Sequence, residues 1–404
     1  MALNCVWYGL AASFIVAALQ QSPSRLLSRW GTLLTVSIFC MPFGWQNALW
    51  GLQSHTYLCL LTASITLWAQ ARRSSCRLST CITLAACFVG IFSTAAGLIT
   101  PLALLLVRLL LCVTKKESWR SQKVLLPSLF IICLVGFLLR VPDPAHDYLR
   151  AKTFSVFFKV LGSCLAWPGI DQPFGAFVMY LPIFLFCFQK LRSNSNETPT
   201  EWMIVFLPAT LALLTAIGIA YARGNGLPDG APLSRYQEML AVGAISNASA
   251  LLLLKPKERK PRHWRLLLIC WLGFFALGAT RLTLVNLYTH LPFKAATNEN
   301  ENQILTAYAR TLDFSLISEK SLFEIGHTDP HVIERVMTHP RLKSILPAPL
   351  SAEPPANILA TATRWFVQFS PILFVVSVLS YAALFLKRRE RNGDLQLERL
   401  KGGQ

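Results

Sequence analysis

The chain has 404 residues, of which 53% are hydrophobic and 14% are charged. Soluble domains carry about 25% charged residues, so this composition excludes an ordinary soluble enzyme, and the recurring apolar runs predict a membrane protein. The net charge of +18 does not indicate nucleic-acid binding, because the basic residues alternate with the apolar runs rather than forming one face. The partner that this pattern predicts is the lipid bilayer.

The apolar runs predict an all-α, polytopic bundle of about eleven transmembrane helices. In chain order, the predicted spans cover residues 3–20, 31–43, 55–71, 78–93, 97–113, 124–140, 173–189, 202–221, 236–254, 264–285 and 366–386. The second is short for a full crossing. Residues 78–113 are too many for one crossing and are interrupted at Ser93–Gly97 and Pro101, which predicts a tight hairpin. Arg108, near the inner end of this hairpin, is expected to extend to the membrane interface.

Lys and Arg are concentrated in alternate connections between the spans. They crowd into residues 115–123, 255–265 and 387–401, whereas the opposite short connections hold few. By the positive-inside rule the crowded connections are cytoplasmic, so the N-terminus is predicted outside and the C-terminus inside. The first helix lacks a basic flank and a clean cleavage site, which favours a retained span over a signal peptide.

This pattern divides the chain into four parts. They are a transmembrane bundle of about ten helices over 1–285, a mostly helical extracytoplasmic segment over 286–365, a last span over 366–386 and a basic cytoplasmic tail over 387–404. In the extracytoplasmic segment, Asn298–Arg310 indicates a polar helix, and Asp329 before a proline predicts a helix that runs to about Thr338. Such a segment suits a small cap better than an independent catalytic domain.

A short amphipathic helix is predicted near residues 153–167, inside an outer connection. Its apolar and polar positions fall on different faces, namely Phe154, Phe157, Phe158, Leu161 and Leu165 against Lys152, Ser155, Lys159 and Ser163. A helix of this kind would lie in the outer membrane interface. It would serve either as a plain anchor or as the wall of a lipid-facing site.

Residues 45–55 combine Trp with neutral hydrogen-bonding side chains at the outer ends of two spans. The polar members are Gln46, Asn47, Gln53 and His55. Amide and imidazole groups between Trp rings suit sugar hydroxyls, which predicts a sugar or acceptor site. The alternative is an ordinary aromatic belt, although a belt does not account for so many hydrogen-bonding groups in one short stretch.

Arg223, Arg235 and Tyr236 lie in or beside a later outer connection. Short outer connections otherwise carry few basic residues, so these two arginines run against the orientation rule. A guanidinium group binds phosphate through parallel hydrogen bonds, and charges at membrane depth are functional candidates. We therefore predict a phosphate-binding role for this stretch, with a purely structural role as the alternative.

No catalytic residue can be assigned from spacing. The outer acids show no pair with the spacing of an acid–base couple; they are Asp143, Asp147, Asp171, Asp229 and Glu238. The eleven cysteines form no CxxC pair, so neither a metal site nor a disulfide framework is predicted. No cofactor is identified; a divalent metal is one candidate, although no ligand spacing supports it.

Several of these stretches resemble bacterial members of the GT-C superfamily of membrane glycosyltransferases. The resemblance lies in Trp45–Gln53 with the following span, the break at Phe92–Gly97, Arg223 with Ser234–Tyr236, and the stretch from His339 to Pro347. It covers roughly residues 40–255 and that C-terminal piece. The resemblance implies the bacterial cytoplasmic (inner) membrane as the location and a polyprenyl-phosphate-linked sugar as the donor at the outer face.

The resemblance also implies an inverting displacement of the polyprenyl phosphate, assisted by a carboxylate base. Arg223 and Arg235 would hold the phosphate, while the four polar residues of the stretch 45–55 would line the sugar or acceptor site. GT-C enzymes carry an acidic catalytic motif in the outer loop after their first span, whereas this chain begins directly in a span. We therefore expect a shortened chain, a divergent one whose base lies elsewhere, or an inactive protein.

Two other functions fit the same pattern. A polymerase or ligase of lipid-linked glycan repeat units would also use outer arginines and a large late loop, with an oligosaccharide on a diphosphate as its donor. A transporter or inactive scaffold is the non-enzyme alternative. Transporters tend to show paired halves and midplane charges, but no internal repeat is found, and Arg281 and Glu238 fall near predicted span ends.

Overall fold

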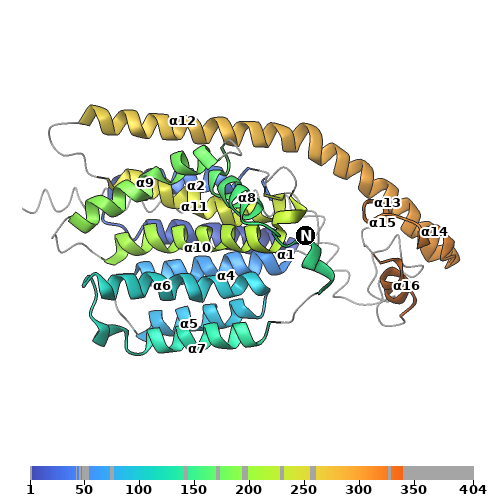
Figure 1. Ribbon diagram of the computed structural model, residues 1–404, viewed down its shortest axis with the longest axis horizontal. Coiled ribbons are helices and arrows are strands. Elements are labelled where there is room, and N and C mark those ends of the chain that lie inside the picture. Colours follow the sequence, from blue (N-terminus) through green and yellow to red (C-terminus); the bar gives the residue numbers. More distant parts are fainter. Residues whose placement is uncertain are drawn as a thin grey trace, which may run out of the picture. The chain divides into compact units, whose positions relative to one another are not determined.

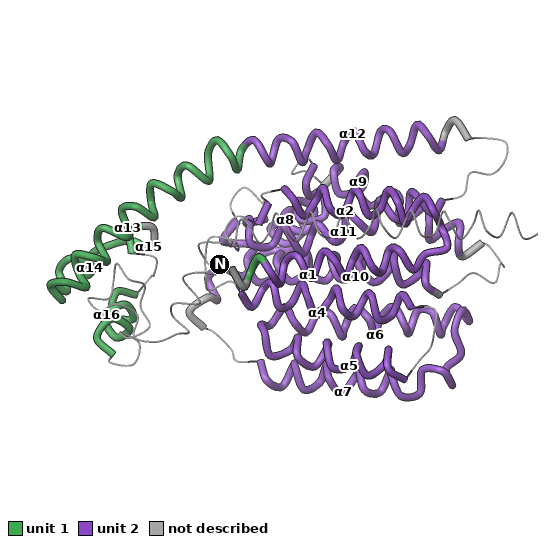
Figure 2. Tube along the Cα trace, turned by 180° about the vertical axis from the view of Figure 1, so that it is seen from behind, with its two compact units in different colours: residues 1–5, 285–404 green, residues 6–284 purple. Residues whose placement is uncertain are grey.

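The computed structural model describes residues 2–41, 43–44, 47, 54–72, 77–140, 144–169, 173–192, 199–227, 232–254, 261–325 and 329–339. These residues form helices joined by loops, and no strand occurs among them (Figure 1). They belong to two compact units, one of Val6–Leu284 and one that combines Met1–Cys5 with Val285–Gln404 (Figure 2).

The larger unit is a bundle of helices, and each apolar segment predicted before residue 286 is helical. Its elements are α1 (Ala2–Leu19), η1 (Leu27–Gly31), α2 (Thr32–Phe39), α4 (Ser54–Ala71), α5 (Arg77–Ile91), η3 (Ala95–Leu98), α6 (Ile99–Val113), η4 (Trp119–Gln122), α7 (Leu125–Leu138), η5 (Pro144–Leu149), α8 (Phe154–Ala166), α9 (Pro173–Arg192), α10 (Pro199–Arg223), η6 (Gly224–Gly226), α11 (Ser234–Leu253) and α12 (Pro261–Val285). The all-α prediction is therefore confirmed, while the predicted span 366–386 lies outside the described residues.

Three helical stretches are long and apolar enough to cross a membrane. They are Ala95–Val113, Thr200–Gly226 and the apolar part of Trp264–Thr311. Other apolar helices are shorter: α5 and α7 have 15 and 14 residues. At 1.5 Å per residue these two rise only about 21–23 Å, less than a hydrocarbon core of about 30 Å. The described helices therefore support three spans rather than the predicted eleven.

Helix α11 is the most deeply packed part of the larger unit, and it lies against α9 and α10. Its interior is rich in small residues, which allow close helix approach. The Gly243 Cα lies so near the Tyr180 hydroxyl that an added Cβ would come within 2.8 Å of it. The buried Ser246 hydroxyl donates a hydrogen bond of 2.5 Å to the carbonyl of Val205 in α10.

The predicted hairpin over 78–113 is confirmed: α5 ends at Ile91, η3 makes the turn and α6 follows. The two helix ends approach closely at Gly90 and Gly97, where a Cβ on Gly97 would overlap the Gly90 carbonyl oxygen. Glycine is needed at position 97 because any side chain there would clash with Gly90, and not because of its backbone conformation.

Helix α8 runs across the direction of the long helices (Figure 1). It matches the helix predicted near 153–167, and the Thr153 hydroxyl caps it by accepting a hydrogen bond from the Val156 amide. Phe154 and Phe158 remain exposed. The predicted polar face was wrong at Ser163, which is buried, because the packed side of α8 consists of small residues that approach α9 and α10.

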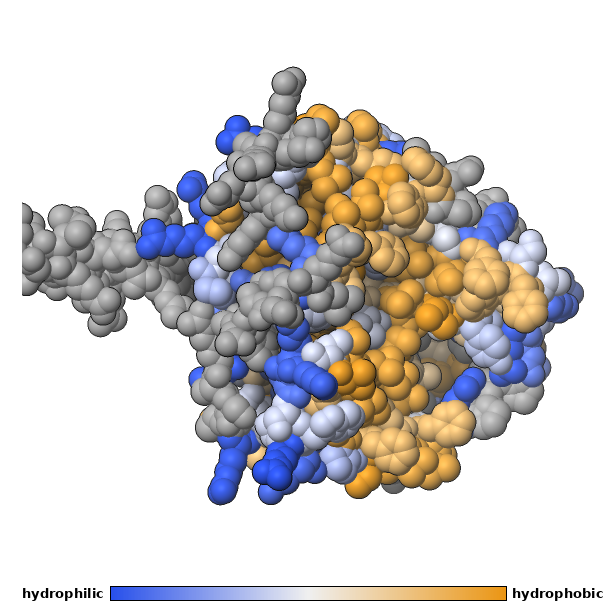
Figure 3. Space-filling model, turned by 60° about the vertical axis from the view of Figure 1, so that its left-hand side comes forward, coloured by the Kyte–Doolittle hydropathy of each residue, from blue (hydrophilic) through white to orange (hydrophobic). Residues whose placement is uncertain are grey.

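Large apolar side chains stay exposed on the outer helices of the larger unit. Examples are Phe88 and Phe92 on and just beyond α5, and Phe130 and Phe137 on α7. On the face seen in Figure 3, apolar residues form a broad band with polar residues on either side of it. Soluble monomers rarely expose apolar patches of such extent.

The smaller unit contains η7 (Asn286–His290), α13 (Leu291–Thr311), α14 (Ser315–Ser318), α15 (Leu322–Ile325) and α16 (Pro330–Thr338). Its core is a small cluster of buried side chains: Tyr308, Ile317, Ile325 and Met337. The two helices predicted around Asn298–Arg310 and from Asp329 to Thr338 are both present, and the Asp329 carboxylate caps α16. Hydrogen bonds from the Ser321 amide, the Lys320 ammonium group and the Ser321 hydroxyl lower the pKa of Glu324 to about 2.

Candidate functional site

The segment around Phe43–Asn47 and the first turn of α11 are joined by hydrogen bonds, although they are far apart in sequence. The Ser234 hydroxyl donates to the Phe43 carbonyl over 2.5 Å, and the Asn47 amide donates to the Arg235 carbonyl over 2.9 Å. The two stretches singled out from the sequence therefore meet at one end of the bundle. Both Ser234 and Asn47 are buried, so these contacts are shielded from solvent.

A buried carboxylate lies directly behind this contact. Glu238, one turn after Arg235, is 4% exposed, and the Asn47 amide and the Tyr57 hydroxyl donate to its two oxygens over 2.5 and 3.0 Å. Gly44 packs against the same group, because an added Cβ would lie 2.0 Å from the Glu238 Oε1 atom. Burying a carboxylate without partners is costly, and these two donors reduce that cost.

Aromatic rings form the wall beside this carboxylate. Tyr8 from α1 stacks on Phe39 from α2 with ring centroids 4.8 Å apart, and it meets Tyr57 edge-on at 5.3 Å. Tyr57 is itself buried. These rings help to enclose Glu238, which is buried among protein groups.

Arg235 and Tyr236 occupy the outer side of the same turn. Both side chains are half-buried, and the Arg235 guanidinium lies 5.2 Å from the centre of the Tyr236 ring. A guanidinium beside an aromatic ring is attracted to the face of that ring, which helps to hold the Arg235 side chain in place. The backbone beneath this side chain is held by Asn47, which restricts where the guanidinium can reach.

Arg223 ends α10 on a neighbouring part of the same end of the bundle. The turn after it packs on the segment that leads into α8: the Ala151 amide donates to the Tyr221 carbonyl over 3.0 Å, and the Asn225 amide donates to the Tyr148 carbonyl over 3.2 Å. Arg223 itself is half-buried. The predicted phosphate-binding arginines thus start from two adjacent helices, α10 and α11.

The other predicted binding residues have different fates. His55 is exposed on the first turn of α4, two residues before Tyr57. Asn47 is completely buried, so it acts on the site through Arg235 and Glu238 and not by facing solvent. Gln46 and Gln53 lie outside the described residues.

Of the five acids considered for catalysis, the structure describes Asp147 and Glu238. Asp147 is exposed and pairs with Arg150 over 2.8 Å, and Glu238 is enclosed. Asp143, Asp171 and Asp229 fall outside the described residues. Among the residues that the structure describes, no group of three or more His, Cys, Asp or Glu side chains could hold a metal ion.

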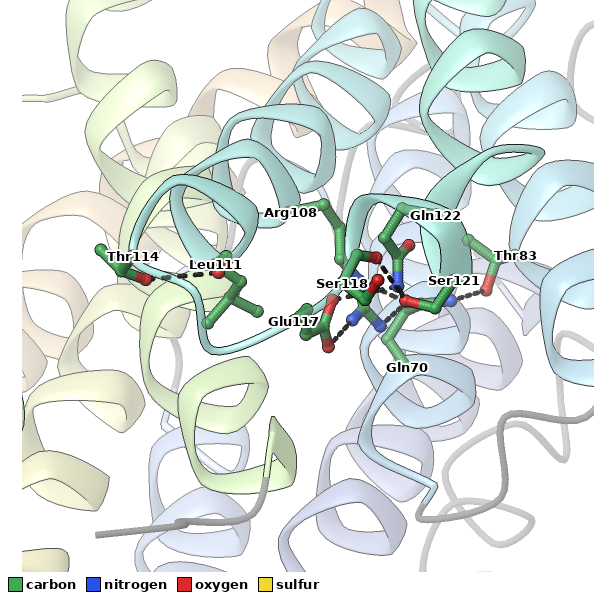
Figure 4. Close-up of polar contacts among 9 residues, drawn as sticks. All are labelled: Gln70, Thr83, Arg108, Leu111, Thr114, Glu117, Ser118, Ser121 and Gln122. Atoms are coloured by element: carbon green, nitrogen blue, oxygen red, sulfur yellow. Dashed lines mark hydrogen bonds and ion pairs between the residues drawn. The ribbon is translucent and has the colours of Figure 1, made fainter. Parts of the chain in front are cut away.

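A second polar cluster lies near the C-terminal ends of α4 and α6. It is therefore far from the start of α4, which is near Asn47, and from the start of α6, which follows η3. Figure 4 shows Arg108 between Gln70 and Glu117: its guanidinium forms an ion pair with Glu117 and donates to the Gln70 amide oxygen. The Gln70 amide nitrogen donates to Thr83 over 2.7 Å, and Gln122 donates to Glu117 over 3.0 Å. The extension of Arg108 to the membrane interface stays a prediction: the side chain is buried, and its guanidinium reaches Glu117 in the connection that follows α6.

Sequence reasoning missed the partners of the carboxylate. Glu238 stood out as one of five outer acids and as a charge near a predicted span end, while Tyr8, Phe43 and Tyr57 were not singled out. Tyr57 could have been noticed, because its hydroxyl lies one turn into an apolar helix, on the same face as Ser54 three residues earlier. The contact between Gly44 and Glu238 could not be recognised from the sequence near either residue.

Comparison of the chain with models of known protein families, with curated proteins and with solved structures gives no match. The resemblance to GT-C enzymes therefore rests on the short stretches quoted above.

Proposed function

We propose that the protein is a GT-C-like glycosyltransferase of the bacterial cytoplasmic (inner) membrane, which transfers a sugar from a polyprenyl-phosphate carrier to an acceptor at the extracytoplasmic face. The observation that carries this proposal is the hydrogen bond from Asn47 to the Arg235 carbonyl. It joins a stretch suited to sugar hydroxyls with an arginine suited to phosphate, which is the combination that a lipid-linked sugar requires.

In the proposed reaction, an acceptor hydroxyl oxygen attacks the anomeric carbon of the bound sugar. The bond from that carbon to the phosphate oxygen breaks, the polyprenyl phosphate leaves with the electron pair, and the hydroxyl proton passes to a carboxylate base. Arg223 and Arg235 bind the phosphate and stabilise the charge that develops on it. The side chain of His55, exposed beside this end, is assigned to the sugar or acceptor together with Gln46 and Gln53.

The same proposal places the larger unit in the membrane with its Arg235 end outside. The exposed apolar side chains of α5 and α7 would face lipid, and the shorter helices would cross together with flanking loops or a locally thinned bilayer. The proposal includes the predicted eleven spans, with the N-terminus outside and the C-terminus in the cytoplasm.

The test is sugar transfer in membranes that contain Arg235→Ala. Loss of one charge-assisted contact to the phosphate should lower transfer by about tenfold or more. A matched control is Arg281→Ala, which removes an arginine from α12 and is expected to leave transfer within about twofold of the wild type. Equal protein abundance is checked by immunoblot, and full activity of Arg235→Ala would end this proposal.

A second candidate is a protein that binds lipid-linked phosphate without transferring the sugar. The burial of Glu238 favours it, because the acid nearest Arg235 in sequence is enclosed by Asn47, Tyr57 and Gly44. Under this alternative, the protein binds a polyprenyl-phosphate sugar through Arg235. No transfer product then forms, whichever acceptor preparation is added. Product formation by the purified protein would exclude it.

A further inference from the structure

We infer that Glu238 is a positioning residue that gives Arg235 its selectivity for phosphate, acting through the side chain of Asn47. This inference rests on the proposed function, because it assumes that Arg235 binds the carrier phosphate. It assigns Glu238 no contact with the substrate and no proton transfer.

The enclosure of Glu238 argues against a direct chemical role. One carboxylate oxygen receives the Asn47 amide and the other receives the Tyr57 hydroxyl, while Gly44 covers the group from the side of the preceding loop. A general base needs an acceptor hydroxyl within hydrogen-bond reach of a carboxylate oxygen. Glu238 is buried, and each of its oxygens already accepts a hydrogen bond from a protein donor.

The geometry of the Asn47 amide links the carboxylate to the arginine. The Asn47 Nδ2 atom has two hydrogens, and it donates to the Glu238 carboxylate and to the Arg235 carbonyl. If this amide rotated by half a turn, its oxygen would face two acceptors and both contacts would be repulsive. An acceptor at Glu238 therefore fixes the amide, and the fixed amide holds the backbone from which the Arg235 side chain extends.

The contacts also determine which replacements of Glu238 should be tolerated. Glutamine can present its oxygen to the Asn47 amide and its NH₂ group to the Tyr57 oxygen, so the bridge to Arg235 survives without the charge. Methionine has a similar length but offers no strong acceptor, so Asn47 loses the partner that orients it. A base would behave differently, because a Glu238→Gln substitution removes its proton acceptor.

The experiment uses the full chain in neutral phosphatidylcholine nanodiscs and two probes, a long-chain polyprenyl monophosphate and the matching polyprenyl alcohol. The readout is phosphate selectivity, defined as the Kd for the alcohol divided by the Kd for the monophosphate. General damage to the fold weakens binding of both probes, whereas loss of positioning weakens binding of the phosphate alone. The control variant is Glu201→Met, which removes the carboxylate that pairs with Lys190 over 3.2 Å at the other end of the bundle.

We expect Glu238→Met to lower phosphate selectivity by about tenfold or more, and Glu238→Gln and Glu201→Met to change it by less than about threefold. Tyr57→Phe removes one donor to Glu238 and spares the bridge, so its effect should be small. If Glu238→Met does not accumulate, Asn47→Leu tests the same bridge with the carboxylate retained, and its selectivity should fall equally.

Unchanged selectivity in Glu238→Met or in Asn47→Leu would overturn the inference and leave the proposed function intact. A loss in Glu238→Gln as large as in Glu238→Met would also overturn it, since a charge would then be needed at this position. Failure of the proposed function looks different: Arg235→Ala would then bind the monophosphate as well as the wild type does.

Discussion

At the scale of single residues, each buried Arg, Lys or Glu side chain in the described part of the larger unit has a polar partner from another part of the chain. Glu238 receives Asn47 and Tyr57, Arg108 pairs with Glu117, and Lys190 pairs with Glu201. Removing one member of either ion pair typically costs about 3–5 kcal/mol, because the remaining charge stays in the interior. These residues are therefore expected to be much less replaceable than the arginines and lysines in exposed loops.

Gly44 gives a direct test of the Glu238 pocket. A Cβ at this position would overlap the carboxylate, so Gly44→Ala should displace Glu238 from Asn47 and Tyr57. Overpacking together with lost hydrogen bonds predicts a destabilisation of about 2–4 kcal/mol. The measurement is the thermal unfolding of the purified protein in detergent.

The control for that experiment is Gly218→Ala in α10, where an added Cβ would meet nothing within 4 Å. Replacing an uncrowded helical glycine by alanine should stabilise the protein by roughly 0.5–1 kcal/mol. An unfolding temperature for Gly44→Ala at or above that of the wild type would show that Glu238 is not enclosed as described.

Only part of the residue-level site could be predicted from the sequence. Asn47, Arg235 and Tyr236 stood out because polar and basic groups at apolar segment ends violate the usual pattern. The pairing of Glu238 with Tyr57 could not be predicted, since it joins residues from two helices with more than half of the bundle between them in sequence. The ion pair of Arg108 with Glu117 could not be predicted either, because it depends on how the connection after α6 folds.

At the scale of elements, α8 has the surface of a helix that lies along an interface. Its first turns present Phe154, which is 84% exposed, and Phe158, which is 60% exposed, one turn apart on one face. Burial of each ring is worth about 1.5–3 kcal/mol, so leaving both in water would be unfavourable. Exposed Lys152 and Lys159 flank these rings, as expected for a helix at the level of lipid headgroups.

Photo-crosslinking tests this arrangement. With p-benzoylphenylalanine replacing Phe154 or Phe158, illumination of nanodiscs should attach a phospholipid to the protein, detected as a shift in intact mass. Lys159 is also exposed and lies about 140° from Phe154 and about 100° from Phe158 around the helix, so it provides the matched position. Equal lipid attachment from positions 159 and 154 would contradict an interfacial orientation.

Helix positions were well predicted because runs of apolar residues mark the helices. Capping residues mark some helix ends, such as Asp329 before α16. The burial of α8 was predicted less well. Small residues on its packed side, Ser163 among them, carry no hydrophobic signal, although they make the close contacts. Span number could not be fixed either, because several helices are shorter than a bilayer core and only their neighbours decide whether they cross.

At the scale of the whole molecule, the larger unit places its two polar clusters at opposite ends of the bundle. The Asn47–Glu238 cluster lies at the starts of α4 and α11, whereas the Arg108–Glu117 cluster lies at the ends of α4 and α6. If the unit crosses a bilayer, these two ends face different compartments. The alternating distribution of Lys and Arg predicts that the Arg108 end is cytoplasmic.

Cysteine labelling of intact cells tests this topology. In a variant whose exposed native cysteines are replaced by serine, His55→Cys should react with a membrane-impermeant maleimide. Ser121→Cys, in the η4 turn beside the Arg108 cluster, should react only after the cells are opened. Both positions are exposed in the structure, so a difference in labelling reports on the side of the membrane. Reaction of Ser121→Cys in intact cells would invert or abolish the proposed orientation.

The Arg108 cluster has one further consequence, which concerns how neighbouring helices find their register. Helix α6 is so rich in leucine that its surface looks similar after a slip of one turn, about 5.4 Å, along α4. Such a slip would place the Arg108 guanidinium among leucine side chains. Gln70, Thr83 and Glu117 would lose their hydrogen-bond partners as well. Apolar packing alone would tolerate many alignments of these helices, and the polar cluster selects one of them.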